Sequence, residues 1–360
     1  MALKRRGVPP AAILNFVSSL GVSTSKTSVK LSRFEQTVRQ MLEMSTPRLM
    51  MLLRPIKVVL ENVPEDFFVE IEKPLHPKVP EMGSNKVPLT KVLYIDADDF
   101  KAEADKDFFR LAPGATVGLF KAPCPITYVS HDTDADGKVT SIVCRYENGD
   151  KPPKPKTYIQ WVGEHANSRS PVYLRETRLM ERLFKSDNPG ALKDAEMIAD
   201  LNPSSLTLLE GTMIETGIWD VVRTSLAESK RVVEERKKTA EAAGLTAPPS
   251  VDGLECVRFQ AMRVAYFCLD SEDTKLDAQA GTGDLVLNQI AALKQDAGKV
   301  PKPEPKAPAK PKAPKMPKKD KDLKEKEKQA KKEKKEKERA AAAAAAAGAP
   351  ASEPAPPASA

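Results

Sequence analysis

The sequence predicts a mainly β protein with an N-terminal helical region and a low-complexity C-terminal tail. Three observations predict this class. Apolar residues recur at helical spacing within residues 1–46. Short β-rich runs, separated by Gly, Pro, Asn and Asp, fill the chain from Pro47 to about residue 270. From about Asp296 the composition changes to Pro, Lys and Ala, which is typical of an extended, disordered tail.

The first helix is predicted at residues 10–20. Pro9 and Pro10 suit a first helical turn, where a missing N–H costs little. Gly21 can take a positive φ after the last turn. A basic patch precedes this helix and consists of Lys4, Arg5 and Arg6.

A second helix is predicted before the β-rich part. Ser32 stands three residues before Glu35, which is the spacing of a capping box. The helix should end at Thr46, because a residue that precedes proline is disfavoured in the α region.

The runs after Pro47 have the spacing of strands in a β-barrel or a sandwich. They include "PIKVVLENV", "KVLYIDADDF", "VTSIVCRYE" and "CVRFQAMRVAYFCLD". No regular alternation of strands with long helices occurs, which excludes a doubly wound sheet. Between two of the late runs, residues 221–246 have the composition of a charged helical insert.

The net charge of +7 comes from the tail, because Lys is concentrated between residues 301 and 340 and residues 1–300 are close to neutral. A nucleic-acid surface on the body must therefore be a local patch. The tail has two alternative interpretations: non-specific attraction to phosphates, or a solubilising extension without a partner. Docking to other translation proteins through the tail is a third.

The sequence offers no catalytic constellation. "HDTDADGKVTSIV" resembles half of a calcium loop, but a β-hairpin turn at Asp136-Gly137 explains the same residues. Asp96, Asp98 and Asp99 in "YIDADDF" are interpreted as a strand end that enters a turn. We expect no metal site, since the four cysteines form no CxxC and the three histidines stand in no ligand pattern.

The cysteines and the hydropathy pattern predict the compartment. Widely spaced cysteines in apolar runs are expected to be free thiols of a reducing compartment. No apolar run is long enough to span a bilayer, and the N-terminus has no signal-peptide pattern. We therefore expect a cytoplasmic protein without a membrane partner.

Several long stretches resemble the C-terminal half of glutaminyl-tRNA synthetases, a family of class I aminoacyl-tRNA synthetases. They include "RRGVPPAAILNFVSSLGVS", "TPRLMMLLRPIKVVLEN", "HPKVPEMGSNKVPLTKVLYIDADDF" and "VRFQAMRVAYFCLD". The resemblance runs from about Leu3 to Asp270 and excludes the charged insert. It implies a mainly β fold with an N-terminal helical region, two anticodon-binding β-barrels and a disordered Lys/Pro/Ala-rich C-terminal tail.

The resemblance also implies domain boundaries. Residues 1–46 would be a helical connector region, and residues 47–153 the first barrel. Residues 154–275 would be the second barrel, with the insert 221–246 and a late strand that returns to the first barrel. Residues 276–360 would be a linker and the tail.

In this family a separate Rossmann domain binds ATP with Mg²⁺ and activates glutamine. Neither its His-Ile-Gly-His signature nor a Met-Ser-Lys loop occurs here. We therefore expect a portion of a glutamine–tRNA ligase that lacks the catalytic domain, needs no cofactor itself and is inactive alone. The alternative is a stand-alone, non-catalytic tRNA-binding or synthetase-complex scaffold protein.

The resemblance places anticodon contacts on four residues, with glutamine tRNA as the partner and no role for DNA. Arg48 and Gln260 lie where the family holds the central uracil, and Arg263 resembles a part of the same pocket. Arg110 lies where the family contacts the third base, a guanine, whose O6 and N7 suit an arginine fork.

Phe108 and Phe109, next to Arg110, have two interpretations. They could stack on splayed bases, or pack in a barrel core, which we expect for at least one of them. Gly118 and Phe120 stand where some members place arginines, so the contacts to the first anticodon base stay open.

Overall fold

The computed structural model describes residues 2–22, 24, 29–105, 107–186, 188–246 and 253–293. Within these residues it is mainly β, with few helices, as the sequence predicts. Residues 294–360, and with them the predicted tail, lie outside the described part. No helix in the described part combines the length and the apolar composition needed to cross a membrane.

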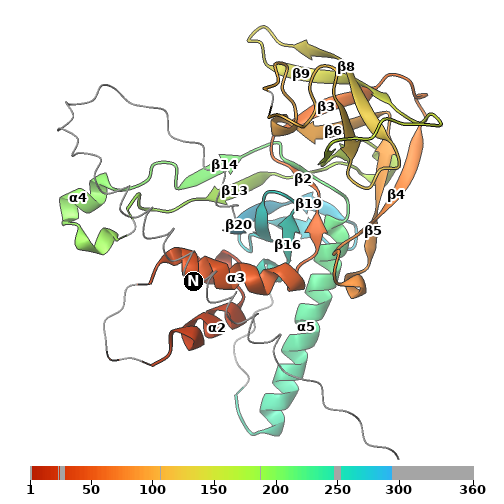
Figure 1. Ribbon diagram of the computed structural model, residues 1–360. Coiled ribbons are helices and arrows are strands. Elements are labelled where there is room, and N and C mark those ends of the chain that lie inside the picture. The colour runs from red at the N-terminus through yellow and green to blue at the C-terminus, as the bar shows by residue number, and fades with distance from the viewer. Residues whose placement is uncertain are drawn as a thin grey trace, which may run out of the picture. The chain divides into compact units, whose positions relative to one another are not determined.

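Three helices open the chain: α1 (Ala2–Arg5), α2 (Pro10–Leu20) and α3 (Leu31–Ser45). The α2 and α3 helices pack together, and the Phe16 and Phe34 rings meet edge to face at 5.1 Å. Together they cover one face of a β-sheet (Figure 1). The buried residues of this layer are Val8, Ala12, Val38, Leu42, Tyr266, Cys268, Ile290 and Ala291.

The prediction for α2 is confirmed residue by residue, and Gly21 has a positive φ of 70°. The capping box is wrong: α3 begins at Leu31, its N-cap is Lys30, and no side chain caps it there. Ser32 lies inside the first turn. The helix is held instead by the burial of Val38 and Leu42 on its apolar stripe.

The basic patch before α2 fastens the N-terminal segment to the β-sheet. Arg5 Nε donates to Asp270 Oδ2 at 2.8 Å, and Arg6 Nε donates to the carbonyl oxygen of Gln289 at 3.0 Å. Lys4 Nζ lies 3.3 Å from a carboxylate oxygen of the buried Glu255. These cations therefore have carboxylate or carbonyl partners within the fold.

A seven-stranded sheet in the order β10-β7-β8-β9-β3-β6-β11 forms the first β unit. Its strands are β3 (Pro55–Leu60), β6 (Val92–Asp96), β7 (Thr116–Leu119), β8 (Pro125–Thr133), β9 (Val139–Tyr146), β10 (Tyr158–Ile159) and β11 (Val162–Gly163). The two edge strands, β10 and β11, are separated only by Gln160 and Trp161. Because three residue steps span at most about 11 Å, the sheet must curl until its edges approach each other.

A hairpin of β4 (Phe68–Pro74) and β5 (Ser84–Thr90) packs against this curled sheet. The shared core includes Trp161, whose Nε1 donates to the carbonyl oxygen of Phe120 at 3.0 Å. The turn at Asp136-Gly137 joins β8 to β9, as predicted, and Gly137 has a φ of 77°.

The second β unit contains a six-stranded sheet in the order β1-β16-β17-β20-β13-β14. Its strands are β1 (Arg48–Leu49), β13 (Glu176–Met180), β14 (Leu206–Leu209), β16 (Arg258–Ala261), β17 (Ala265–Leu269) and β20 (Val286–Ala292). A three-stranded sheet of β2 (Met51–Leu52), β12 (Val172–Tyr173) and β15 (Met213–Ile214) shares its core. A late strand, β16, thus pairs with the first strand of the chain, β1.

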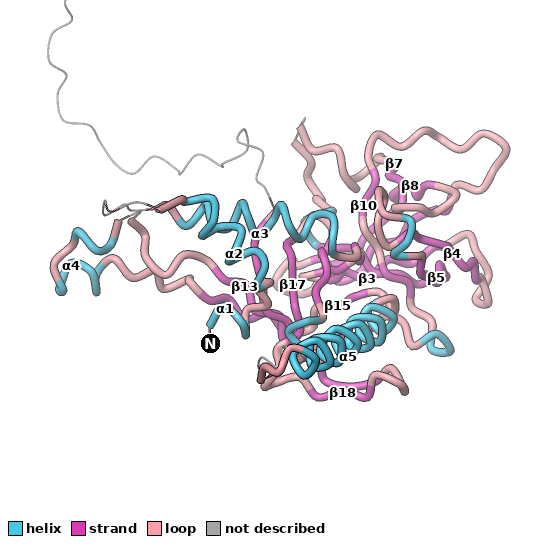
Figure 2. The backbone as a smooth tube through the Cα atoms, turned by 90° about the horizontal axis from the view of Figure 1, so that it is seen from below, coloured by secondary structure: helices cyan, strands magenta, loops and turns pink. Residues whose placement is uncertain are grey.

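Within the described residues after position 180, two further helices occur: α4 (Asp194–Ala199) and α5 (Ile218–Ala242). The first turns of α5 are buried through Ile218, Trp219, Val221 and Val222, and the rest is largely exposed. Figure 2 shows the small hairpin of β18 (Lys275–Asp277) and β19 (Thr282–Asp284) beside this helix. The long, exposed part agrees with the charged composition.

The structure corrects one boundary. We expected residues 276–360 to be linker and tail, but residues 275–292 form β18, β19 and β20. The β20 strand pairs with both β17 and β13 in the interior of the six-stranded sheet. Residues 286–291 are buried on both faces of the sheet, and this burial offsets the entropy lost when their backbone is ordered.

Candidate nucleic-acid interface

Arg48 and Gln260 are direct neighbours in two parallel strands. The pairing of β1 with β16 sets Arg48 opposite Gln260, and the Gln260 N–H donates to the carbonyl oxygen of Pro47 at 2.8 Å. Gln260 in turn faces Tyr266 on β17. Residues in register point to the same side of a sheet. The three side chains therefore lie on the side that α2 and α3 cover in part.

Two buried polar atoms at this place lack a partner. Neither Arg48 Nε nor Gln260 Oε1 has a hydrogen bond with any described residue, although both atoms are shielded from solvent. Burying an unpaired donor or acceptor costs about 1–3 kcal/mol. An unpaired donor and an unpaired acceptor in neighbouring strands suggest a ligand that offers one acceptor and one donor to them.

The backbone of Arg48 is held from both ends. Its N–H donates to the carbonyl oxygen of Leu75 at 2.6 Å, and its carbonyl oxygen accepts from Lys73 Nζ at 2.8 Å. Lys73 is itself buried and lies 2.9 Å from a carboxylate oxygen of Glu215. Burial raises the pKa of Glu215, and the Lys73 ammonium opposes that shift.

Arg110 and Arg263 meet on a single carboxylate, that of Asp99. Arg263 donates to both carboxylate oxygens, at 2.9 and 3.3 Å, and Arg110 Nη1 lies 2.9 Å from the first of them. Arg110 Nη1 also donates to the carbonyl oxygen of Asp98 at 3.0 Å. Burial raises the pKa of Asp99, and the two guanidinium groups oppose that shift.

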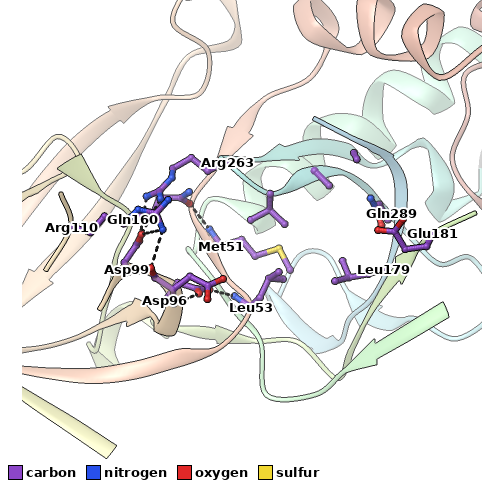
Figure 3. A pocket seen from close by; sticks show the side chains of 14 residues that line it. Met51, Leu53, Asp96, Asp99, Arg110, Gln160, Leu179, Glu181, Arg263 and Gln289 are labelled. Atoms are coloured by element: carbon purple, nitrogen blue, oxygen red, sulfur yellow. Dashed lines mark hydrogen bonds and ion pairs between the residues drawn. The ribbon is translucent and has the colours of Figure 1, made fainter. Parts of the chain in front are cut away.

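Asp99, Arg110 and Arg263 line a pocket of about 390 Å³ between the two β units. Figure 3 shows Arg110, Arg263 and Gln160 gathered around Asp99 at one side, with Leu179, Glu181 and Gln289 at the other. Arg48 and Gln260 do not line it. The four predicted residues therefore form two pairs, and Arg263 lies with Arg110 rather than with Arg48 and Gln260.

This division has a geometric cause. Arg263 lies in the turn between β16 and β17, beyond the end of the register that aligns Arg48 with Gln260. Its backbone has a φ of 64°, which is unusual for a side chain with a Cβ and sends the chain back on itself. The side chain consequently reaches Asp99 instead of the helix-covered face.

Gln160 is a pocket residue that the sequence did not single out. Its Oε1 accepts from the Met51 N–H at 3.3 Å, and its Nε2 donates to the carbonyl oxygen of Met262. It therefore ties the turn that bears Arg263 to the strand β2. A polar residue between two core residues, Ile159 and Trp161, was the available signal.

The two phenylalanines beside Arg110 are not in a core, contrary to the expectation for at least one of them. Phe109 is 58% exposed. The Lys101 ammonium lies over the ring of Phe108, with Nζ 5.1 Å from the ring centroid. The segment that carries them is a loop and not a strand, so strand alternation does not apply. Phe109, which precedes Arg110 in the chain, is left with an accessible ring.

Comparison with known proteins gives a consistent result. Residues 46–147 match the family of tRNA synthetases class I (E and Q), anti-codon binding domain. Both Arg48 and Arg110 fall inside this match.

Curated relatives match a longer stretch. A probable glutamine–tRNA ligase of Schizosaccharomyces pombe is 46% identical over 83% of this chain and 34% of its own length. The glutamine–tRNA ligase of Saccharomyces cerevisiae is 40% identical over 83% of this chain and 36% of its own. That of Pseudoalteromonas atlantica is 33% identical over 83% and 47%.

The chain thus spans between a third and a half of the length of these relatives. The match includes the anticodon-binding domain and continues well beyond it. The chain therefore contains the anticodon-binding domain of class I (E and Q) tRNA synthetases, and over 83% of its length it is similar to the part of glutamine–tRNA ligases that contains this domain.

Proposed function

We propose that this chain binds the anticodon of glutamine tRNA and supplies that recognition to a glutamine–tRNA ligase. Two findings support the choice of partner. The matched domain is described as an anticodon-binding domain, and the relatives are named glutamine–tRNA ligases. Single-stranded loop bases can be splayed apart, and a few polar side chains can then recognise their Watson–Crick edges.

The observation that carries the proposal is the pair of unpartnered atoms, Arg48 Nε and Gln260 Oε1. Uracil presents carbonyl oxygens that accept hydrogen bonds beside one N–H that donates. A free donor and a free acceptor in neighbouring strands complement that edge. Cytosine, which presents an amino group and an unprotonated ring nitrogen there, offers the reverse pattern. The pair thus suits the central uracil of a glutamine anticodon.

The third base is assigned to Arg110. Its contacts with Asp99 and with the carbonyl oxygen of Asp98 both use Nη1. The edge formed by Nη2 and Nε can therefore still donate to O6 and N7 of a guanine. The Arg110 side chain is 39% exposed, and the preceding residue, Phe109, has an accessible ring on which a base could stack.

The chemical step belongs, in this proposal, to the part of the relatives that this chain does not match. Attachment of glutamine would use ATP with Mg²⁺ there, and no residue of the described part is assigned to it. The four cysteines are unpaired, which suits a reducing compartment. We accordingly propose that the recognition takes place in the cytoplasm.

A binding comparison tests the proposal. The chain is titrated with glutamine tRNA and with a transcript whose central anticodon uracil is replaced by cytosine. The expected loss is about 1–3 kcal/mol, which is the usual cost of a wrong base at a specific contact. Equal affinity for both RNAs, at several salt concentrations, would show that the chain does not recognise this base.

A further inference from the structure

We propose that Tyr266 is a further residue that determines specificity at the central anticodon base. Its hydroxyl donates to one carbonyl oxygen of the uracil, while Arg48 Nε donates to the other and Gln260 Oε1 accepts from the ring N–H between them. The inference rests on the proposed function, because it adds a third contact to the two that are assigned there to this base.

The three side chains form a row across three neighbouring strands. Arg48 on β1 lies opposite Gln260 on β16, and Gln260 lies opposite Tyr266 on β17. Neighbouring strands are about 4.8 Å apart, and residues in register point to the same face of the sheet. Gln260 is therefore the middle member of the row, on the face that α2 and α3 cover in part.

The Tyr266 ring is buried, but its hydroxyl is not paired. Tyr266 is 4% exposed and belongs to the apolar layer under α2 and α3, together with Leu42 and Ile290. A buried tyrosine usually has a hydrogen-bond partner for its hydroxyl. Among the described residues none forms a hydrogen bond with this one. With Arg48 Nε and Gln260 Oε1, the row thus contains three polar groups that lack a partner in the described part.

The charges around the phenol agree with this placement. Burial, the largest effect, and the Glu43 carboxylate raise the pKa of Tyr266 above its usual value. The positive charges of Arg48 and Arg39 oppose that rise, so the phenol lies within the field of the Arg48 guanidinium, as the register requires. Because its pKa is raised, the hydroxyl keeps its proton at neutral pH and can donate a hydrogen bond.

The order of the three groups complements uracil. The Watson–Crick edge of uracil presents a carbonyl oxygen, an N–H and a second carbonyl oxygen. The row presents a donor on Arg48, an acceptor on Gln260 and a donor on Tyr266, in the same order. A site with the first two groups alone would leave one carbonyl oxygen of the base unpaired, which has a cost in a shielded place. The hydroxyl supplies the missing contact.

The substitution Tyr266→Phe removes the hydroxyl and keeps the ring. Its affinity for glutamine tRNA should fall about two- to tenfold, the range of one hydrogen bond between neutral groups. The free energy of unfolding should stay unchanged or rise slightly, because no described residue pairs with the hydroxyl in the free protein. The matched control is Tyr173→Phe, because Tyr173 is a 58% exposed tyrosine in the three-stranded sheet.

The experiment measures the affinity of the whole chain for glutamine tRNA with uridine, 2-thiouridine or 4-thiouridine at the central position. Sulfur accepts hydrogen bonds more weakly than oxygen, so each thio form weakens one of the two carbonyl contacts. The loss in Y266F relative to the wild type should be full for uridine and for one thio form. It should be smaller for the other form, in which sulfur replaces the oxygen that the hydroxyl contacts. Y173F should bind all three forms as the wild type does.

Several results would overturn the inference. They are an unchanged affinity of Y266F for the uridine form, an equal loss in Y266F for all three forms, or the same loss in Y173F. A lower free energy of unfolding in Y266F would also overturn it, because the hydroxyl would then be paired within the protein. If the wild type does not distinguish uracil from cytosine at the central position, the proposed function itself fails. Discrimination by the wild type with no effect of Y266F removes only Tyr266 from the site.

Discussion

Arg48 and Gln260 lie side by side because a two-residue strand pairs in parallel with a strand more than 200 residues later. The pairing fixes the backbones, while Arg48 Nε and Gln260 Oε1 stay without a hydrogen bond in the described part. Such atoms lower the stability of the free protein and favour a bound state in which they are paired. The specificity proposed at this position therefore has a cost in the unbound fold.

The substitution Arg48→Ala tests this at the residue scale. It removes the donor and should weaken binding of glutamine tRNA by about 1–3 kcal/mol, while the preference for uracil over cytosine at the central base is largely lost. Arg145→Ala is the matched control, because Arg145 is an exposed arginine whose partner is Glu61.

The two possible roles of Arg48 give different patterns. If R48A lowers the affinity for both transcripts by the same factor, Arg48 contacts only phosphate. In that case the salt dependence of binding should also become shallower by about one unit of slope. A shallower slope with unchanged base preference would therefore remove Arg48 from base recognition.

The sequence could indicate some site residues but not their grouping. Arg48, Arg110, Gln260 and Arg263 stand in stretches that resemble a known family, yet their anticodon roles remain predictions. The contact between Asp99 and Arg263 was not predictable, because the two residues are 164 positions apart in the sequence. The same applies to Gln160, which is 102 residues from its partner Met262. Contacts at this range depend on strand pairing, and no local pattern records them.

Among the elements, those with a clear period were predictable. The α2 helix has prolines at its start and an apolar stripe, and both signals lie within the segment itself. The β20 strand was missed because it is buried on both faces and shows no alternation of apolar and polar residues. Its closeness to the Pro/Lys/Ala-rich composition also suggested a linker. Its place in the sheet is set by β13 and β17, which are remote in sequence.

The β4–β5 hairpin offers a test at the element scale. Lys73→Met removes an ammonium that ion-pairs with Glu215 and supports the carbonyl oxygen of Arg48. A carboxylate left buried without its partner should destabilise the fold by about 3–5 kcal/mol at neutral pH. Lys86→Met is the matched control, since Lys86 lies in the same hairpin in an exposed pair with Glu70, and its loss should leave the stability nearly unchanged.

The pH dependence of K73M has a definite sign. Burial raises the pKa of Glu215, so in the variant the folded state retains a proton at pH values where the unfolded chain has lost it. The stability of K73M relative to the wild type should therefore fall as the pH rises from about 4 towards 7. Chemical denaturation at several pH values measures this difference. If the difference in stability between K73M and the wild type stays constant across that range, Glu215 is not the group that causes the pH dependence.

At the scale of the whole molecule, the charge distribution assigns base recognition and general attraction to RNA phosphates to different parts of the chain. Residues 1–300 are close to neutral, and the described arginines of the pocket are paired with Asp99. The excess of Lys lies between residues 301 and 340, outside the described part. Such a segment can add affinity for phosphates of any RNA but cannot distinguish one base from another.

Deletion of residues 301–360 tests the role of that segment. If the tail attracts tRNA, the shortened chain should bind more weakly at low salt, and its affinity should depend less steeply on salt concentration. The ratio of affinities for the uracil and cytosine transcripts should stay the same. An unchanged salt slope would assign the tail no part in RNA binding.

The most direct test of the central claim is a chemical footprint of glutamine tRNA bound to this chain. Reagents that modify the Watson–Crick edges of uracil and guanine report each anticodon base separately. The central uracil and the third guanine should be protected by the wild type, R48A should lose the protection of the uracil, and R145A should keep both. Protection confined to the backbone, or located away from the anticodon loop, would contradict the proposed recognition.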